Sequence, residues 1–314
     1  MKKPVVAVVG ADGFVGGGLA DALHAQRIVY GPCRNGDITV NQAAAALQKA
    51  DIIVNAGGFR VRRGLRYEDY QRCHQGATSA LVPWIRRGAT LIHISSAHVL
   101  GKSTNGKLDN HSTPDPASYP CDTYAIAKYE TDLYLQKAAT EGGFKVIFLR
   151  PTILYVGVGD SSLPDNLIKL AKKGIFLRLY PRDARHHFCN MQILMEVARR
   201  VAEEHERIPH LTCLVVSDPY TISNRELESV IRERLRQRAI PVPVPAPLMS
   251  SLLRHTFHSS NPKFDIATWG DIFGVFHLDT EYDSSETFAM LGIDPARYSR
   301  EKTLVPFIER AVQS

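Results

Sequence analysis

The stretch Val9-Gly10-Ala11-Asp12-Gly13-Phe14-Val15-Gly16 decides the fold prediction for this chain. It follows an apolar run that begins at Val5, and it leads into a helical pattern over residues 14–25. The glycines permit a tight turn between strand and helix and let the two elements pack closely. The stretch therefore predicts a strand-turn-helix unit at the start of the chain.

Short apolar segments and helical patterns alternate beyond this unit. The predicted strands are 28–30, 52–55, 90–95 and 145–149, and the predicted helices are 43–49, 67–87 and 124–139. The strands are continuous and rich in Val and Ile, as parallel strands buried on both faces are. We predict an α/β fold with a Rossmann-type doubly wound parallel sheet.

The glycine turn is also suited to binding a dinucleotide. Gly10 permits the tight turn, Gly13 lets the backbone approach a pyrophosphate, and Gly16 lets helix and strand pack closely. The unpaired N–H groups and the dipole at the start of the following helix favour the negative charge. A plain structural turn is the alternative interpretation.

The regular alternation ends after Pro151. Helices are predicted at 163–173, 193–203 and 224–237, with a strand at 212–216, and the prolines between Pro241 and Pro247 predict a surface connector without regular structure. We expect residues 1–160 to form a dinucleotide-binding Rossmann domain. Residues 161–314 are expected to form mainly a smaller α+β substrate lobe, with some segments returning to the Rossmann sheet.

The segment after the second strand bears on the choice of dinucleotide. It lacks the acidic residue that holds a ribose 2′-hydroxyl and offers Arg34, which matches a 2′-phosphate. NADP(H) is therefore favoured, while NAD(H) stays open because Arg34 can equally be a solvated charge. In Asp37-Ile38, Asp37 can cap the adenine or form a turn.

Tyr124 and Lys128 are spaced for proton transfer. They stand at i and i+4 of a predicted helix, so both side chains project from one face. A neighbouring ammonium favours the phenolate of a tyrosine, which otherwise has a pKa of about 10. Ser96, at the end of a predicted strand, supplies a hydroxyl for the same substrate oxygen. These three residues are the predicted catalytic group for reducing a ketone or oxidising an alcohol.

With these motifs in this order, the chain resembles the extended short-chain dehydrogenase/reductase superfamily, in its epimerase/dehydratase branch. The resemblance extends from Val5 nearly to the C-terminus. Further matching motifs are Asn55-Ala56-Gly57, Ser95 to Gly101, Leu149-Arg150-Pro151, Tyr282-Asp283-Ser284-Ser285 and Leu291-Gly292.

The resemblance implies that Ser96, Tyr124 and Lys128 form the catalytic triad. It also implies that Pro151 lies near the nicotinamide. The other cofactor contacts expected beside the glycines, Tyr124 and Lys128 are Asp12, Phe14, Val15, Asn55, Ala56, Gly57, Ile94 and Thr152. Ala97 and His98 stand where sugar 4,6-dehydratases carry an Asp-Glu pair, which argues against a dehydratase.

Substrate residues are suggested by the same resemblance. Asn166 resembles a nucleotide-holding residue, Arg185 a diphosphate-binding arginine, and His98 and Ser96 face the pocket. Arg60 lies in an arginine-rich loop that suits a phosphorylated ligand or is simply solvated. Surface roles for Asn166 and Arg185 are equally open. Departures from the pattern at Cys73, Ile153 and 191–193 leave room for a different ligand.

We therefore expect an NAD(P)-dependent oxidoreductase or epimerase that transfers hydride to or from a secondary alcohol or ketone. The substrate expected is an anionic nucleotide-linked sugar. One alternative is a reductase or dehydrogenase of an apolar ketone or steroid-like alcohol. A second alternative, of another class, is a protein that senses the dinucleotide without turnover.

Composition limits the class of protein. The 314 residues are 44% hydrophobic and 22% charged with a formal charge of +6, and the basic residues are dispersed. We expect a protein without nucleic-acid partner, membrane span or bound metal, located in the cytoplasm, and relatives suggest a homodimer. The five cysteines, with no C-x-x-C pair, are expected to be free thiols.

Overall fold

The central sheet of this computed structural model has six parallel strands in the order β10-β5-β4-β3-β1-β2. The structure describes residues 3–29, 40–59, 65–103, 106–118, 122–157, 163–235, 239–245, 247–249 and 278–314. The strands are β1 (Val6–Val9), β2 (Gln26–Ile28), β3 (Ile52–Asn55), β4 (Thr90–Ile94), β5 (Lys145–Pro151) and β10 (Thr212–Val216). The predicted Rossmann-type parallel sheet is confirmed.

Both faces of the sheet are buried, which explains why its strands are apolar at nearly every position. Along β1, Val8 belongs to the hydrophobic core on one face, and Ala7 and Val9 belong to the core on the other. The same alternation separates Ile147 from Phe148 in β5. A strand covered on both sides cannot place a polar side chain in solvent, so its sequence shows no two-residue alternation.

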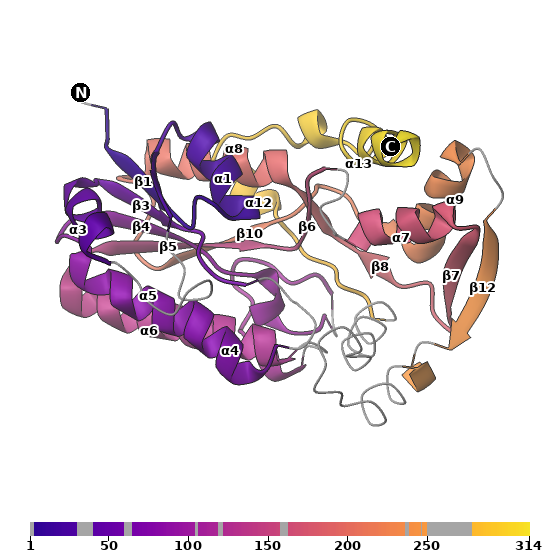
Figure 1. The fold of residues 1–314 in the computed structure, drawn as a ribbon, viewed down its shortest axis with the longest axis horizontal. Helices are drawn as coiled ribbons and strands as arrows, with labels where there is room; N and C mark the ends of the chain where they lie inside the picture. Colours follow the sequence, from indigo (N-terminus) through magenta and orange to yellow (C-terminus); the bar gives the residue numbers. More distant parts are fainter. Residues whose placement is uncertain are drawn as a thin grey trace.

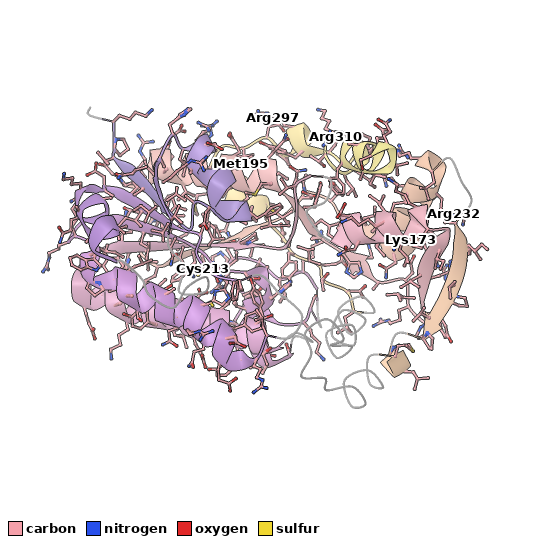
Figure 2. All side chains as sticks on the ribbon, in the orientation of Figure 1. Lys173, Met195, Cys213, Arg232, Arg297 and Arg310 are labelled. Carbon is pink, nitrogen blue, oxygen red and sulfur yellow. The ribbon has the colours of Figure 1, made fainter. Side chains whose placement is uncertain are left out.

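Helices cover the two faces (Figure 1). On one face lie α1 (Phe14–Ala22), α8 (Met191–Glu204) and α12 (Ser285–Met290), and on the other α3 (Val40–Lys49), α5 (Ala77–Leu81) and α6 (Asp122–Gly142). Helices α1 and α8 approach closely: a methyl group at Gly18 would lie 3.0 Å from Met191 Cε and 3.3 Å from the Sδ atom of Met195, labelled in Figure 2. In the described part of the chain, no helix has the length and apolar composition to cross a membrane.

A second core lies beside the carboxyl edge of the sheet. Helices α7 (Leu163–Lys172), α9 (Asn224–Arg234) and α13 (Leu304–Gln313) pack around the paired strands β7 (Ile175–Tyr180) and β12 (Ile240–Pro245) (Figure 1). Two further pairs join β6 (Ile153–Tyr155) to β9 (Phe188–Asn190) and β8 (Arg185–His186) to β11 (Ile222–Ser223). Strand β10 and helix α8 come from the same half of the chain but belong to the central sheet and its helical layer.

The helix predicted over residues 67–87 is interrupted. Helix α4 (Tyr67–Gln71) continues into a π-helical turn over Arg72–Gly76, followed by α5 and a 3-10 turn over Val82–Trp84. Pro83 lacks the N–H that a regular helix needs, which explains the last change. The wider π turn shifts the phase of the side chains, and it buries both Cys73 and His74. The predicted helix is thus present over residues 67–84, with π and 3-10 turns that the sequence analysis did not predict.

The proline-rich segment forms strand β12, so the prediction that it interrupts regular structure is wrong. β12 runs parallel to β7, and the Ile240 N–H donates to the Gly174 carbonyl oxygen at 2.8 Å. In a parallel pair, alternate residues bond the same neighbour, so Val242 and Val244 also turn their N–H groups to β7. The prolines occupy the intervening positions, which face away from β7 and need no donor.

This register makes a prediction about stability. Val242→Pro removes an N–H that bonds β7, and we expect it to lower the free energy of unfolding by about 2–3 kcal/mol. Pro243→Val removes no bond to β7. The free energy of unfolding should therefore fall by no more than about 0.4–1 kcal/mol, the effect of a more flexible unfolded chain. Chemical denaturation followed by circular dichroism measures both, and equal losses would show that the register is different.

Candidate active site

The turn after β1 has the tight geometry that its glycines predict. Gly10 has a φ of +77°, and its carbonyl oxygen accepts from the Gly13 N–H at 2.9 Å. A Cβ atom at Gly16 would lie only 2.1 Å from that same oxygen. Asp12 and Phe14 are exposed at the turn and Val15 is half-buried. The start of α1 is therefore open to a ligand, and its first turn carries no acidic side chain to repel an anion.

The end of β3 closes on this turn. The Ala56 N–H donates to the Val9 carbonyl oxygen at 3.1 Å, and a Cβ atom at Gly10 would lie 2.9 Å from the nitrogen of Gly57. Asn55 shapes the bend: its Oδ1 accepts from the Gly57 N–H at 3.2 Å, and its Nδ2 donates to Thr78 Oγ1 at 3.1 Å. β1 and β3 lie at the reversal of strand order, where open α/β sheets bind ligands.

The described residues fit a nicotinamide dinucleotide. The glycine turn offers a cradle that side chains would fill, and a buried hydroxyl is available where β5 ends after Pro151. This hydroxyl is Thr152 Oγ1, which has no hydrogen-bond partner within the described residues. The predicted cofactor residues Arg34, Asp37 and Ile38 and the predicted substrate residue Arg60 lie outside the described residues.

Lys128 is held at the carboxyl end of the sheet. Its Nζ donates to the carbonyl oxygen of Ile94, the last residue of β4, at 2.9 Å, and its side chain is 5% exposed. Burial lowers the pKa of Lys128 to about 8, against the opposing effect of the Asp132 carboxylate. An ammonium with this pKa can exchange a proton near neutral pH.

Tyr124 lies one helical turn before Lys128 on α6, surrounded by other rings. Its ring makes edge contacts with Tyr70, His74 and His98, at centroid distances of 5.5, 5.6 and 6.0 Å and interplanar angles of 75–77°. Such edge-to-face pairs each stabilise by about 0.5–1.5 kcal/mol beyond burial. The orientation of the phenol is therefore set by rings from three other segments.

Ser96 and His98 lie in one turn next to Tyr124. Ser96 Oγ accepts from the His98 backbone N–H at 3.2 Å and begins the 3-10 turn Ala97–Leu100. This turn brings the His98 ring against Tyr124. The structure thus brings Ser96, His98, Tyr124 and Lys128 to the same region of the sheet edge.

The two imidazoles that contact Tyr124 are neutral at physiological pH. Burial lowers the pKa of His98 to about 4. Burial, followed by the nearby Lys128 and His93, lowers the pKa of His74 well below its ordinary value, and a hydrogen bond with the Phe59 backbone opposes this. A neutral imidazole offers one donor and one acceptor nitrogen. The three rings that contact Tyr124 within the described residues are therefore uncharged.

A buried ion pair behind Lys128 escaped the sequence analysis. Asp132 Oδ2 accepts from Ser95 Oγ at 2.8 Å and from Arg150 Nη2 at 3.2 Å, and all three side chains are buried. The sequence does carry a signal, because Asp132 stands one turn after Lys128 on the same helix face. Tyr70 and His74 had no such signal, because the π turn changes the phase of their helix.

The predicted nucleotide-binding residues lie in the second lobe. Asn166 is exposed on α7. Arg185 is on β8, where its Nη2 donates to Thr221 Oγ1 at 2.7 Å and its Nη1 lies 3.7 Å from Glu226 Oε2. These contacts orient a half-exposed guanidinium, and its role toward a substrate stays a prediction.

The expectation of five free thiols is wrong for Cys73, which is disulfide-bonded. Cys189 and Cys213 are free, and burial raises the pKa of both. Cys213 lies on β10, left of the centre of the view in Figure 2. Over the described ranges, no cluster of three His, Cys, Asp or Glu side chains is arranged to hold a metal ion.

The sequence from β1 to the start of β7 matches a known family. A family model described as "NAD dependent epimerase/dehydratase family" covers residues 6–175, more than half of the chain. The chain belongs to this family. The predicted membership of the epimerase/dehydratase branch is thereby confirmed.

Solved structures of this fold cover nearly the whole chain. UDP-glucuronic acid 4-epimerase from Bacillus cereus, in complex with NAD, is 15% identical, with a TM-score of 0.72 over 98% of this chain and 96% of that one. RMD from Pseudomonas aeruginosa, complexed with NADPH, is 15% identical, with a TM-score of 0.70 over 99% and 100%. UDP-N-acetylglucosamine 4-epimerase from Methanobrevibacter ruminantium M1, in complex with UDP-N-acetylmuramic acid, is 15% identical, with a TM-score of 0.71 over 100% and 98%. At these identities the likeness shows the fold.

One curated relative is much longer. The hybrid PKS-NRPS synthetase gkaA of Penicillium citrinum is 26% identical over 166 residues, which are 49% of this chain. The match covers only 4% of that protein, so the chain spans a small part of its length.

The glycine turn gives a matched pair of variants. In Gly16→Ala the new methyl would overlap the Gly10 carbonyl oxygen, so the turn must move, and we expect dinucleotide affinity to fall at least about tenfold, about 1.4 kcal/mol. In Gly17→Ala the methyl would lie 3.4 Å from the Ala11 carbonyl oxygen, an ordinary contact. This control should bind the dinucleotide normally, and its free energy of unfolding should rise by up to about 1 kcal/mol. Calorimetric titration with NADH and NADPH measures both, and unchanged binding by Gly16→Ala would contradict a pyrophosphate site at this turn.

Proposed function

We propose that this protein is an NAD(P)-dependent oxidoreductase or epimerase that acts on a secondary alcohol or ketone of a nucleotide-linked sugar. The observation that carries the proposal is the position of Lys128 at Ile94, one turn after Tyr124 and at the edge of the sheet that also holds the glycine turn. This arrangement combines a proton-transfer pair with a dinucleotide cradle. A nicotinamide dinucleotide, when bound, supplies the hydride acceptor and donor for this chemistry.

The proton chemistry belongs to Tyr124. As an alcohol is oxidised, its hydroxyl proton passes to Tyr124 Oη, and as a ketone is reduced, Tyr124 returns a proton to the carbonyl oxygen. The Lys128 ammonium favours the phenolate that accepts the proton. The hydroxyl of Ser96 holds the same substrate oxygen.

We place the dinucleotide in residues 1–160, together with β10 and α8, and the substrate mainly in residues 161–314. The glycine turn, Asn55-Ala56-Gly57 and Ile94 would hold the dinucleotide, with Pro151 and Thr152 near the nicotinamide. His98 would contact the sugar, and Asn166, Arg185 and Arg60 would contact the nucleotide or its phosphates. The half-exposed Arg185 guanidinium supports this assignment.

The identity of the sugar substrate is inferred from chemistry and from structural relatives. Two of the compared proteins are UDP-sugar 4-epimerases, and one of them is in complex with a UDP-linked sugar derivative. An anionic diphosphate also suits a chain with a formal charge of +6. Ala97 and His98 stand in place of an acidic pair, and we infer that the protein does not dehydrate its substrate.

One observation favours a second candidate, a reductase or dehydrogenase of an apolar ketone or steroid-like alcohol. The rings of Tyr70, His74 and His98 enclose Tyr124, and both imidazoles are neutral. Such surroundings also suit an apolar substrate. Trials with nucleotide sugars and with apolar ketones separate the two candidates by the substrate class that is turned over, and nicotinamide absorbance then identifies the reaction. A product with net change in nicotinamide absorbance indicates a reductase or dehydrogenase, and a product without net change indicates an epimerase.

The role of Tyr124 is tested by Tyr124→Phe. Loss of the proton donor should lower kcat about 10²–10⁴-fold, while the affinity for the dinucleotide stays within about threefold. Tyr134→Phe removes a hydroxyl from the same helix at the core behind the sheet, and it should leave both quantities unchanged. Full turnover by Tyr124→Phe would remove Tyr124 from the mechanism. If the unsubstituted protein binds the dinucleotide but turns over no substrate, the result would favour a dinucleotide sensor.

The preference for NADP(H) is proposed from Arg34 and is tested separately. Arg34→Ala should weaken NADPH binding about 10–100-fold, because a charge-assisted contact worth about 1.5–3 kcal/mol is lost. NADH binding should change little, since NADH has no 2′-phosphate. Titration of the variant with NADPH and with NADH gives the ratio of the two affinities. An equal loss of affinity for both would overturn the assignment of Arg34 to the 2′-phosphate.

A further inference from the structure

A buried carboxylate and two buried cations lie below the candidate active site. Asp132 is fully buried on α6, and Arg150, 3% exposed at the carboxyl end of β5, donates to it at 3.2 Å. Lys128 stands one turn before Asp132 and is itself buried. The cluster therefore contains one negative and two positive groups.

Within the described residues, the neighbours of this cluster do not supply a second anion. Lys128 stands one helical turn after Tyr124 and interacts electrostatically with Asp132 on its own helix, with His74 from the π turn and with His93 from β4. Asp132 is faced by Ser95, Arg150, His93 and the thiol of Cys213. Both histidines are neutral, because burial and Lys128 lower their pKa values well below the ordinary range.

Arg150 favours the ionised form of Asp132. Burial raises the pKa of Asp132 above its ordinary value, and the Arg150 guanidinium, the Ser95 hydroxyl and Lys128 oppose this rise. A guanidinium keeps its proton throughout the accessible pH range, and a buried one left without an anion would be strongly unfavourable. The Arg150 charge thus holds the carboxylate in the form that Lys128 needs.

We propose that Asp132 is a positioning residue that keeps Lys128 in its ammonium form and that Arg150 limits this effect by sharing the same carboxylate. Among the described residues the cluster has one anion for two cations, so it keeps a surplus positive charge one helical turn from Tyr124, and loss of the Tyr124 proton would balance this charge. The importance of this charge balance for turnover rests on the proposed function.

The test is a direct titration of Lys128 in the protein without dinucleotide. Lysine ε-carbon resonances of the carbon-13-labelled protein are followed against pH, and Lys128→Met identifies the resonance. The midpoint expected for the unsubstituted chain is about 8. Activity is not needed for this measurement, so its outcome is independent of the substrate.

Two variants, one that removes the anion and one that removes the second cation, should shift the Lys128 midpoint in opposite directions. Asp132→Asn removes the anion and leaves Arg150 uncompensated, so the midpoint should fall by about one pH unit or more. Arg150→Met removes the competing cation, so the midpoint should rise. A purely structural ion pair would destabilise the protein in both variants without giving shifts of opposite sign.

Controls separate charge from folding. Asp132→Glu keeps the charge and should restore the midpoint. Glu130→Gln removes another carboxylate of α6, one that accepts a hydrogen bond from the Tyr67 hydroxyl, and should not move the Lys128 midpoint. If Asp132→Asn does not fold, the double variant Asp132→Asn/Arg150→Met avoids a buried guanidinium without an anion, and Lys128 should still titrate below the Arg150→Met value.

Several outcomes would overturn the proposal. They are unchanged midpoints in folded Asp132→Asn and Arg150→Met, shifts in the same direction, or a shift of equal size in Glu130→Gln. If the opposite shifts occur and no turnover is found with any sugar nucleotide or ketone, the charge relation stands and the proposed function fails instead.

Discussion

The hydrogen bond from the Lys128 ammonium to the Ile94 carbonyl oxygen joins the helix that carries Tyr124 to the strand that leads to Ser96. Its donor comes from the second turn of α6 and its acceptor from the last residue of β4. Because both groups are buried, the bond is made in surroundings where an unpaired ammonium would be strongly unfavourable. This contact helps to fix the relative position of the helix that carries Tyr124 and the strand that leads to Ser96.

The residues around that contact are buried polar groups beside the proposed reactive centre. Four side chains with titratable groups are buried there: Lys128, Asp132, His74 and His93. Burial drives the histidines to their neutral form, while Arg150 favours the charged form of the carboxylate. Burial of these groups changes their pKa values and so determines which of them are protonated. It also lowers the stability of the fold, and apolar packing elsewhere offsets this loss.

The sequence was most informative where one local pattern determines one local structure. The glycine turn, the Val- and Ile-rich strands and the spacing of Tyr124 and Lys128 all led to the observed elements, because each depends on a few neighbouring residues. Prediction failed where the outcome depends on distant partners. β12 exists because its non-proline N–H groups meet β7, and His74 reaches Tyr124 because a π turn changes the phase of its helix. Asp132 had a readable spacing, but its partner Arg150 comes from a strand that the sequence alone does not place beside it.

The return of β10 and α8 to the central sheet bears on how the protein is synthesised. β5 ends at Pro151, but the strand that pairs with its outer edge is β10, which begins only at Thr212. A ribosome must therefore release about 60 further residues before that edge is covered. Until then the nascent chain presents an unpaired apolar strand, a feature that favours association with chaperones and makes a truncated N-terminal fragment prone to aggregate.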